Sequence, residues 1–570
     1  MKNLKLIFEK KHLISIFLIT IFIILTTILE SLSIGLIFPI LTLLVEPTGN
    51  NEIYFFSLFF EYLNLFNSDN KISFFLGFFV IIYAVKVSFL VFFSWYNNKF
   101  GFDLHNHLSK KIYKKYLEQN IDFFKRKKTG AIIADITTEV SMFINSGLSS
   151  LIILISNFFI LLGFFIVLIL IDIKLTLLLI FCTSVIASLF SIFNKKLLLR
   201  WGINRQENEA KRIHFLNQGL NSIKEAKIYN KVSWFLEKFN HSNILVHKSI
   251  RNYDFFKTLP RFLIELLILI LSVGIILFMY KENSFNTLIP FLGVLFFGFF
   301  RTIPIISQML TSIQSMNYVK PSYDLIINIL KLETVEEISS KVNSQLDLNK
   351  TIEIKNLSFS YENSSRRILD NINLTINKGD CIGIVGESGA GKSTFVDIVM
   401  ALIKPNTGGI LVDNKNIFEN KKGWQKVIGY VPQSIYLIDD SIKKNIAFGY
   451  DETQIDNKEI QKSIKLSDLS GLINDLSEKE NTQIGEKGAK ISGGERQRIA
   501  IARCLYMNPQ LIIFDEATSS LDLDTENNIV KSISKLIGKK TLIIVSHRMT
   551  TLDKCNKIYE LKDGKLHLKL

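Results

Sequence analysis

Long apolar stretches dominate the first 325 residues of the sequence. A helix needs about 20 apolar residues to cross a bilayer. Six segments reach that length, at roughly residues 13–44, 73–96, 141–171, 174–194, 259–280 and 287–310. We therefore expect a membrane α-helical domain of six transmembrane helices in residues 1–325. From residue 341 onward short strands, glycine turns and amphipathic helices alternate, which predicts an α/β domain in residues 341–570 after a linker at 326–340.

The distribution of charge supports a membrane protein. Residues 1–340 contain 34 basic and 23 acidic side chains, a net charge of +11. Residues 341–570 contain 33 basic and 29 acidic side chains, a net charge of +4. A nucleic-acid binder carries its basic stripe on a soluble surface, so an excess in the apolar half opposes nucleic acid as a partner. Basic segments of membrane proteins face the cytoplasm. The lysine-rich start of the chain and the basic stretches at 97–140 and 195–257 therefore predict a multi-pass inner-membrane protein with both termini in the cytoplasm.

Two of the cytoplasmic stretches are too long to be simple loops. The first shows a heptad-like apolar spacing, at Phe102, Leu104, Leu108, Ile112 and Tyr116. This spacing predicts that helices two to five continue beyond the bilayer, although a solvated helix surface is the alternative. We expect short transverse elements near residues 120–126 and 222–229, where the long helices turn back.

A phosphate-binding motif follows the apolar strand expected at residues 381–385. It matches G-x-x-x-x-G-K-[ST] in residues Gly386, Glu387, Ser388, Gly389, Ala390, Gly391, Lys392, Ser393 and Thr394. The glycines let main-chain N–H groups surround a β-phosphate, Lys392 neutralises β- and γ-oxygens, and the Ser393 hydroxyl is a ligand for Mg²⁺. In its strand–turn–helix context the motif predicts a site for ATP and Mg²⁺.

A second apolar strand, expected at residues 511–514, ends in Asp515 and Glu516. Asp515 is expected to hold Mg²⁺ through water, and Glu516 is placed to activate the attacking water. Many strands at sheet edges end in two acidic residues, so this pattern alone is weak evidence for a nucleotide site. Together with the phosphate-binding motif that precedes it, the evidence is strong.

A third motif, at Ser492, Gly493, Gly494 and Glu495, forms a turn that opens a helix. With the Gln-Arg pair that closes it, this motif resembles the signature of ATP-binding-cassette proteins. This chain has Ile491 where the family has a leucine, and Glu495 where the family has a glutamine. The resemblance implies that this helix N-terminus caps the γ-phosphate held by the opposite cassette. Two chains, as a homodimer, would then complete each site.

Four more residues match the family in order along the chain. Tyr361 is similar to the adenine-stacking aromatic, Gln433 to the Q-loop sensor, Asp522 to the D-loop and His547 to the switch histidine. The resemblance implies that the catalytic residues are Glu516, His547 and Gln433, and that the Mg²⁺ ligands are Ser393, Gln433 and Asp515. Six helices followed by one cassette resemble a half-transporter of the type IV, domain-swapped exporter class. This layout implies an ATPase coupled to transport, with the transverse elements as coupling helices.

Three cations lie in the apolar stretches, at Lys86, Arg261 and Arg301. A charge within a bilayer helix costs about 2.5–3.5 kcal/mol on insertion scales unless it faces a cavity or a partner. One interpretation pairs these cations with Glu30 or Glu265, or places them at the membrane surface. The other places all three in a cavity where, doubled by dimerisation, they bind a pyrophosphate.

The membrane half also resembles bacterial flippases for lipid-linked oligosaccharides, of the PglK type, in the strings at 28–41 and 259–261. The implied substrate is a polyprenyl-pyrophosphate oligosaccharide, moved from the cytoplasmic to the outer leaflet of the bacterial inner membrane for protein glycosylation or a surface polysaccharide. The aromatic external segment at 53–66 is too short to span and is expected in the membrane interface, against a lipid tail or as a dimer contact. Alternatives are a lipid A, phospholipid, drug or peptide exporter.

Overall fold

The computed structural model describes residues 2–35, 68–171, 173–281, 285–333, 345–361, 366–485, 488–517 and 523–569. The chain divides into two compact units. The first, which we call the helical unit, comprises Met1–Gln119 and Phe124–Glu333, and the second, the cassette, comprises Asn120–Phe123 and Thr334–Leu570. The external segment predicted at 53–66 lies outside the described residues.

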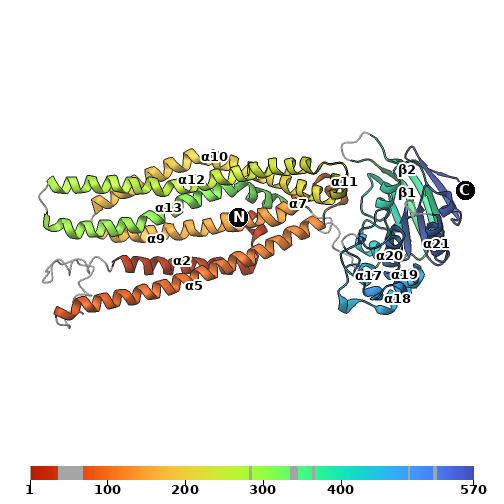
Figure 1. Ribbon diagram of the computed structural model, residues 1–570, viewed down its shortest axis with the longest axis horizontal. Coiled ribbons are helices and arrows are strands. Elements are labelled where there is room, and N and C mark those ends of the chain that lie inside the picture. Colours follow the sequence, from red (N-terminus) through yellow and green to blue (C-terminus); the bar gives the residue numbers. More distant parts are fainter. Residues whose placement is uncertain are drawn as a thin grey trace. The chain divides into compact units, whose positions relative to one another are not determined.

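Four very long helices build most of the helical unit (Figure 1). They are α5 (Ser68–Leu117), α10 (Ile173–Asn221), α12 (Val232–Lys281) and α13 (Phe285–Leu330), of 46 to 50 residues each. At 1.5 Å per residue they are roughly 70–75 Å long, more than twice the ~30 Å core of a bilayer. The shorter elements are α1 (Lys2–Ile7), α2 (Lys10–Gly35), α7 (Thr129–Ala134), α8 (Val140–Met142) and α9 (Ser149–Ile171), with π-helical segments η1 (Asp135–Glu139) and η2 (Phe143–Leu148).

Within the described residues, three stretches are long and apolar enough to cross a bilayer: Lys10–Ser33, Leu76–Leu117 and Thr129–Ile166. The other predicted membrane segments, at 174–194, 259–280 and 287–310, lie inside α10, α12 and α13. Helix α10 packs along α12 and α13, α9 packs against α13 and α2, and α2 packs against α5.

Short helices occupy the positions of the two predicted transverse elements. Helix α6 (Ile121–Arg126) follows α5, and α11 (Ile223–Ile228) joins α10 to α12. Helix α13 continues through Leu330, so residues 326–330, which were expected in the linker, are helical.

A buried ion pair joins three elements of the helical unit. Both guanidinium NH₂ groups of Arg205 on α10 donate to the carboxylate of Glu139 at the end of η1, at 3.0 and 2.8 Å. The hydroxyl of Ser322 on α13 donates to the same carboxylate at 2.5 Å. All three side chains are buried. The Tyr318 ring stacks on Tyr253 of α12 at 4.1 Å, with the guanidinium 5.9 Å from the Tyr318 ring centre, so the network reaches a fourth helix.

In the described part of the cassette, the named strands form two sheets. The antiparallel sheet has the order β2-β1-β4-β5, with β1 (Thr351–Phe359), β2 (Leu369–Asn377), β4 (Thr407–Val412) and β5 (Lys415–Asn416). The larger sheet has the order β10-β9-β3-β8-β7-β6, with β3 (Cys381–Val385), β6 (Ile428–Val431), β7 (Leu511–Asp515), β8 (Thr541–Val545), β9 (Lys557–Lys562) and β10 (Lys565–Leu568). The helices are α15 (Lys392–Val399), α16 (Lys421–Gln425), α17 (Ile442–Ile446), α18 (Asn457–Leu466), α19 (Ser470–Asp475), α20 (Gly493–Tyr506), α21 (Leu523–Ser534) and α22 (Met549–Leu552), with short 3₁₀ turns η3 (Glu452–Gln454) and η4 (Lys479–Asn481).

Three adjacent inner strands of the larger sheet position the candidate site. Strands β3, β8 and β7 are parallel neighbours, and every residue of each strand is buried, as their continuous apolar sequences require. Because they are parallel, their carboxyl ends meet at one edge of the sheet. The phosphate-binding motif follows β3, Asp515 ends β7 with Glu516 directly after it, and His547 lies two residues after the end of β8.

We expect Glu139→Ala to lower the free energy of unfolding by about 3–5 kcal/mol, because it leaves the Arg205 guanidinium buried without its counter-ion. Thermal unfolding of the detergent-purified protein, followed by intrinsic fluorescence, measures the loss as a lower Tm. The control is Glu207→Ala, which removes an exposed carboxylate from the same helix as Arg205. Equal Tm values for the two variants would contradict the prediction that removal of Glu139 leaves an uncompensated charge in the interior.

Candidate nucleotide-binding site

The phosphate-binding loop has the backbone that a phosphate cradle requires. Gly386, Gly389 and Gly391 have φ angles of 156°, 81° and 104°, all in the region that side chains rarely adopt. A Cβ on Gly386 would lie 2.5 Å from the carbonyl oxygen of Leu561, so a larger residue would displace the loop. Helix α15 starts at Lys392, directly after the loop, and its first N–H groups point toward an incoming anion.

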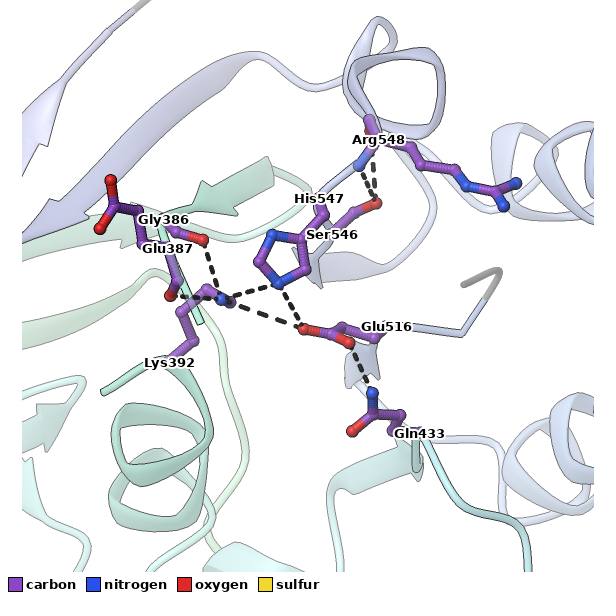
Figure 2. A network of polar contacts seen from close by, with 8 residues as sticks. All are labelled: Gly386, Glu387, Lys392, Gln433, Glu516, Ser546, His547 and Arg548. Carbon is purple, nitrogen blue, oxygen red and sulfur yellow. Dashed lines mark hydrogen bonds and ion pairs between the residues drawn. The ribbon is translucent and has the colours of Figure 1, made fainter. Parts of the chain in front are cut away.

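The ammonium group of Lys392 lies at the centre of the site (Figure 2). It donates to the carbonyl oxygens of Gly386 and Glu387, at 2.9 and 3.0 Å. It also lies 3.0 Å from His547 Nε2 and 4.0 Å from Glu516 Oε1. Burial lowers the pKa of Lys392, and the nearby carboxylates oppose that shift. A phosphate would supply the negative charge that a buried ammonium requires.

Glu516 joins two other predicted catalytic residues (Figure 2). Its Oε1 lies 2.9 Å from His547 Nε2, and its Oε2 accepts a hydrogen bond of 2.6 Å from the amide of Gln433. The backbone of Glu516 has φ 49°, a left-handed conformation uncommon for a residue with a side chain and often associated with functional sites. The structure therefore brings Glu516, His547, Gln433 and Lys392 together in one cluster.

His547 Nε2 faces a donor and an acceptor at once. A single imidazole nitrogen can either accept from the ammonium of Lys392 or donate to the carboxylate of Glu516. If a phosphate bound Lys392, the ammonium would have a stronger acceptor, and Nε2–H could then donate to Glu516. The histidine is therefore placed to respond to the charge that the loop holds.

Asp515 has an environment suited to a cation. Its side chain is buried at the end of β7 and accepts a hydrogen bond of 3.3 Å from the Tyr430 hydroxyl. Burial raises the pKa of Asp515, while the hydrogen bond from Tyr430 opposes the shift. A buried carboxylate of raised pKa is stabilised in its charged form by a nearby cation. With the Ser393 hydroxyl at the start of α15, these oxygen donors fit Mg²⁺.

Tyr361, expected to stack on adenine, lies beside the start of α15. Its hydroxyl is 3.0 Å from Thr394 Oγ1, and its ring packs edge-on against Phe359 with ring centres 5.0 Å apart. The aromatic ring is thus fixed beside the first turn of α15, the helix that follows the phosphate-binding loop.

The third motif forms the N-terminus of α20. Ser492 Oγ accepts from Glu495 N–H at 3.3 Å, and Glu495 Oε2 accepts from Ser492 N–H at 2.7 Å, which is a reciprocal capping box. The glutamate that departs from the family pattern therefore caps the helix. Gly493 and Gly494 form the first turn. Asp522 lies outside the described residues.

Sequence reasoning missed the residues that support His547. Arg548 pairs with the buried Glu526 of α21, and Thr551 Oγ1 donates to the same carboxylate at 3.1 Å. Ser546 Oγ accepts from Arg548 N–H at 3.0 Å. These contacts fix the backbone on both sides of His547. Glu526 is far from His547 in the sequence and has no motif spacing that would have identified it.

The three predicted substrate cations have different surroundings. Lys86 is buried and forms an ion pair of 2.7 Å with Glu30 of α2, so this cation is satisfied without a ligand. Arg261 is exposed and pairs with Glu265, one turn away, at 2.8 Å. Arg301 lies within α13, and its side chain is outside the described residues. The structure does not bring Lys86 and Arg261 into one described site.

Two family models match the chain. The model of the ABC transporter transmembrane region matches residues 13–303, and the ABC transporter model matches residues 369–519. A solved bacterial Atm1-family ABC exporter with ATP bound superimposes with a TM-score of 0.76 at 20% identity, over 96% of this chain and 94% of that one. This likeness concerns the fold. The predicted fold class, a helical membrane domain of the exporter type fused to an α/β P-loop cassette, is confirmed.

Curated relatives share parts or most of the chain. The ATP-dependent lipid A-core flippase of Coxiella burnetii is 29% identical over 460 residues, which cover 80% of this chain and 77% of that protein. The heterocyst differentiation ATP-binding protein HepA of Nostoc sp. is 27% identical over 488 residues, or 85% and 78% of the two chains. The alpha-hemolysin translocation ATP-binding protein HlyB of Escherichia coli O157:H7 is 40% identical over 234 residues, or 41% and 33%.

We expect Glu516→Gln to slow ATP hydrolysis by about 10²–10⁴-fold while the protein still binds ATP, because the amide cannot accept a proton but keeps the shape of the carboxylate. Phosphate release and binding of a fluorescent ATP analogue measure the two properties separately. Glu478→Gln, an exposed change elsewhere in the cassette, is the control. Hydrolysis at the wild-type rate would exclude Glu516 as the base.

Proposed function

Because the chain belongs to the ABC transporters and couples ATP hydrolysis to export, we propose that it is a flippase for a lipid-linked oligosaccharide. In this proposal the glycolipid moves from the cytoplasmic to the outer leaflet of the bacterial inner membrane. The single observation that carries the proposal is an apolar cavity in the helical unit, described below, because a lipid tail needs such a surface.

The cassette residues have distinct roles in the proposed reaction. Lys392 and the first N–H groups of α15 hold the phosphates of ATP. Ser393, Asp515 and the carbonyl oxygen of Gln433 would hold Mg²⁺, which acts as a Lewis acid toward the phosphate oxygens.

Proton transfer in this reaction belongs to the cluster around Glu516. Glu516 accepts the proton of the attacking water, and the N–H of Gln433 orients its carboxylate through the 2.6 Å hydrogen bond. When Lys392 is engaged by phosphate, His547 would donate from Nε2 to Glu516 and so add a second hydrogen bond that orients the carboxylate.

The active unit in this proposal is a homodimer. The capped N-terminus of α20 presents Ser492 and the N–H groups of Gly493 and Gly494, which suit an anion bound by a second cassette. Two such contacts would close the cassettes around two ATP molecules. The short helices α6 and α11 are the proposed coupling helices that pass this closure to the long helices.

The cavity that carries the proposal lies among α1, α2, α5, α9 and α13. Its volume is about 730 Å³, and its lining is nearly all apolar, with Ile16, Ile23, Phe100, Leu151 and Val319 among the walls. Lys320 supplies the charge of the lining. Apolar walls favour a lipid tail, and the ammonium of Lys320 favours an anionic headgroup.

We propose that the pyrophosphate of the substrate binds two arginine side chains, Arg261 and Arg301. Lys86 is set aside because its pair with Glu30 is buried. Arg261 also forms an ion pair, with Glu265, but its side chain is exposed and can exchange this partner for a ligand. Arg301 is the third cation of the apolar stretches. Arginine binds phosphate oxygens through two parallel N–H groups, so both residues suit a pyrophosphate.

A glycolipid of the lipid A-core type is the second candidate, because the Coxiella relative carries that name and shares most of the chain. A peptide exporter is the third candidate, because the alpha-hemolysin translocation relative matches a smaller part of this chain. These candidates differ in headgroup and in tail number, so substrate assays separate them.

We expect a polyprenyl-pyrophosphate oligosaccharide to stimulate the ATPase of the protein in proteoliposomes, and the fluorescent form of that lipid to become accessible from the opposite leaflet only with ATP. Lipid A-core glycolipid and a hydrophobic peptide are tested in parallel. Stimulation by lipid A-core alone would favour the second candidate, and stimulation by the peptide alone would exclude lipid flipping.

We also expect Arg261→Ala combined with Arg301→Ala to weaken the apparent affinity for the pyrophosphate lipid by roughly tenfold to hundredfold, since hydrogen bonds to charged groups contribute about 1.5–3 kcal/mol. Leu151→Trp, which fills the cavity, should reduce lipid stimulation and leave basal ATPase intact. Ile153→Trp is the control, because Ile153 lies two residues along α9, is similarly exposed and is not part of the cavity lining. Unchanged lipid response in both test variants would argue against this binding site.

A further inference from the structure

We propose that Glu9, His12 and His107 form a binding site for a divalent transition metal ion of the Zn²⁺ class. The site would join the N-terminal helices to α5. It lies in the helical unit, apart from the ATP site, and the inference does not depend on the proposed substrate.

The three side chains come from two separate parts of the chain. Glu9 lies between α1 and α2, His12 lies in the first turn of α2, and His107 lies on α5. One ligand atom from each, a carboxylate oxygen and two imidazole nitrogens, lie within 4.8 Å of one another. His107 Nδ1 is 3.5 Å from Glu9 Oε1, and the ring centres of the two histidines are 4.9 Å apart.

Two buried nitrogen atoms of this cluster have no hydrogen-bond partner within the part of the chain that the structure describes, namely His12 Nε2 and His107 Nε2. The His12 residue is only 2% exposed. Buried polar atoms are nearly always satisfied by protein, water or an ion, so two such atoms in neighbouring rings point to a ligand.

Protonation of the rings sets which nitrogen can bind. Glu9 N–H donates to His12 Nδ1 at 3.1 Å, so His12 holds a lone pair on Nδ1 and is neutral or metal-bound rather than doubly protonated. Binding an ion at Nδ1 would replace this hydrogen bond directly. Binding at Nε2 would move the ring proton to Nδ1, which could then no longer accept from Glu9 N–H, so the hydrogen bond is given up in both cases. In either case the ring stays neutral, as a metal-bound imidazole requires.

The donor set selects the class of ion. Two imidazoles and one carboxylate are a common ligand set for Zn²⁺, with a further position left for water, whereas Mg²⁺ and Ca²⁺ prefer oxygen ligands alone. Lys11 pairs with Glu9 at 3.8 Å, and Lys111 donates to the carbonyl oxygen of Leu6 at 2.8 Å. These two cations lower the affinity of the site for any metal, so binding is expected to be reversible.

A bound ion would fix one wall of the apolar cavity. Ile7, Phe8 and Leu13, which flank Glu9 and His12, line that cavity, as does Phe100 of α5. The His12 ring also packs edge-on against Phe100, with ring centres 6.4 Å apart. The metal would therefore hold the start of α2 against α5 at the edge of the cavity.

The test is metal binding by the full-length protein in nanodiscs, without nucleotide and with excess Mg²⁺ to occupy the cassette. Co²⁺ is titrated and its visible absorption recorded, and Zn²⁺ competition then measures affinity. We expect one Co²⁺ per chain with a low-symmetry spectrum that Zn²⁺ removes, and loss of this binding in His12→Ala and in His107→Gln. The control is His105→Ala, on the same helix but turned away from the cluster by its position two residues earlier.

Thermal unfolding keeps the result interpretable if a variant is less stable. Zn²⁺ should raise the Tm of the wild type and of His105→Ala, but not of His12→Ala or His107→Gln, whichever Tm each variant has without metal. Co²⁺ binding and a Zn²⁺-dependent Tm shift that persist in both test variants, or that are absent from the wild type, would overturn the proposal. Because neither readout uses lipid or ATP hydrolysis, failure here leaves the proposed flippase function unaffected, and failure of lipid stimulation leaves the metal site unaffected.

Discussion

The parallel pairing of β3, β8 and β7 is the constraint on which the ATP site depends. Main-chain hydrogen bonds set the register, with Ile384 beside Val545 and Val545 beside Asp515. Each strand therefore ends at the same edge, and the next residues along each chain segment face one another. Lys392, Glu516 and His547 come together because of this register, although more than 150 residues separate the first from the last. Three fully buried strands make a shift of register costly, so the cluster is held in place by the core.

In the helical unit, a buried ion pair sets the relative positions of the long helices. Apolar packing alone would let one helix shift along its neighbour, because one apolar face resembles another. The buried pair of Glu139 and Arg205, with Ser322, adds a contact that only one arrangement satisfies. Such pairs contribute little net stability but exclude alternatives, since any shift leaves a charge buried alone. The ion pair between Lys86 and Glu30 has the same property between α2 and α5.

The sequence predicts the ATP site far better than the interior of the helical unit. The phosphate-binding loop, Asp515 with Glu516, and Ser492 with its glycines are each short motifs in which the reacting groups are neighbours along the chain. The spacing of residues within each motif therefore predicts which side chains act together. His547 has no local motif of comparable strength, and its assignment depended on order within the family.

Contacts between side chains on helices that are distant in the sequence cannot be predicted from the spacing of residues along the chain. Lys86 was expected either to bind a ligand or to pair, and only the structure places it 2.7 Å from Glu30. The cluster of His12 with His107, and the support of His547 by Glu526, also join residues whose separation has no fixed pattern. Helix rotation decides which side chains meet, and a nearly uniform apolar surface does not reveal that rotation.

The length of α10 and α12 has a mechanical consequence. These helices run without a break for about 50 residues on either side of α11. A helix of roughly 75 Å that tilts by about 5° about one end moves its other end by about 6.5 Å. If the two helices moved as rigid rods, a small turn of α11 would become a displacement comparable to the width of a lipid chain at their far ends. Pro260, inside α12, is the point at which that helix would bend instead.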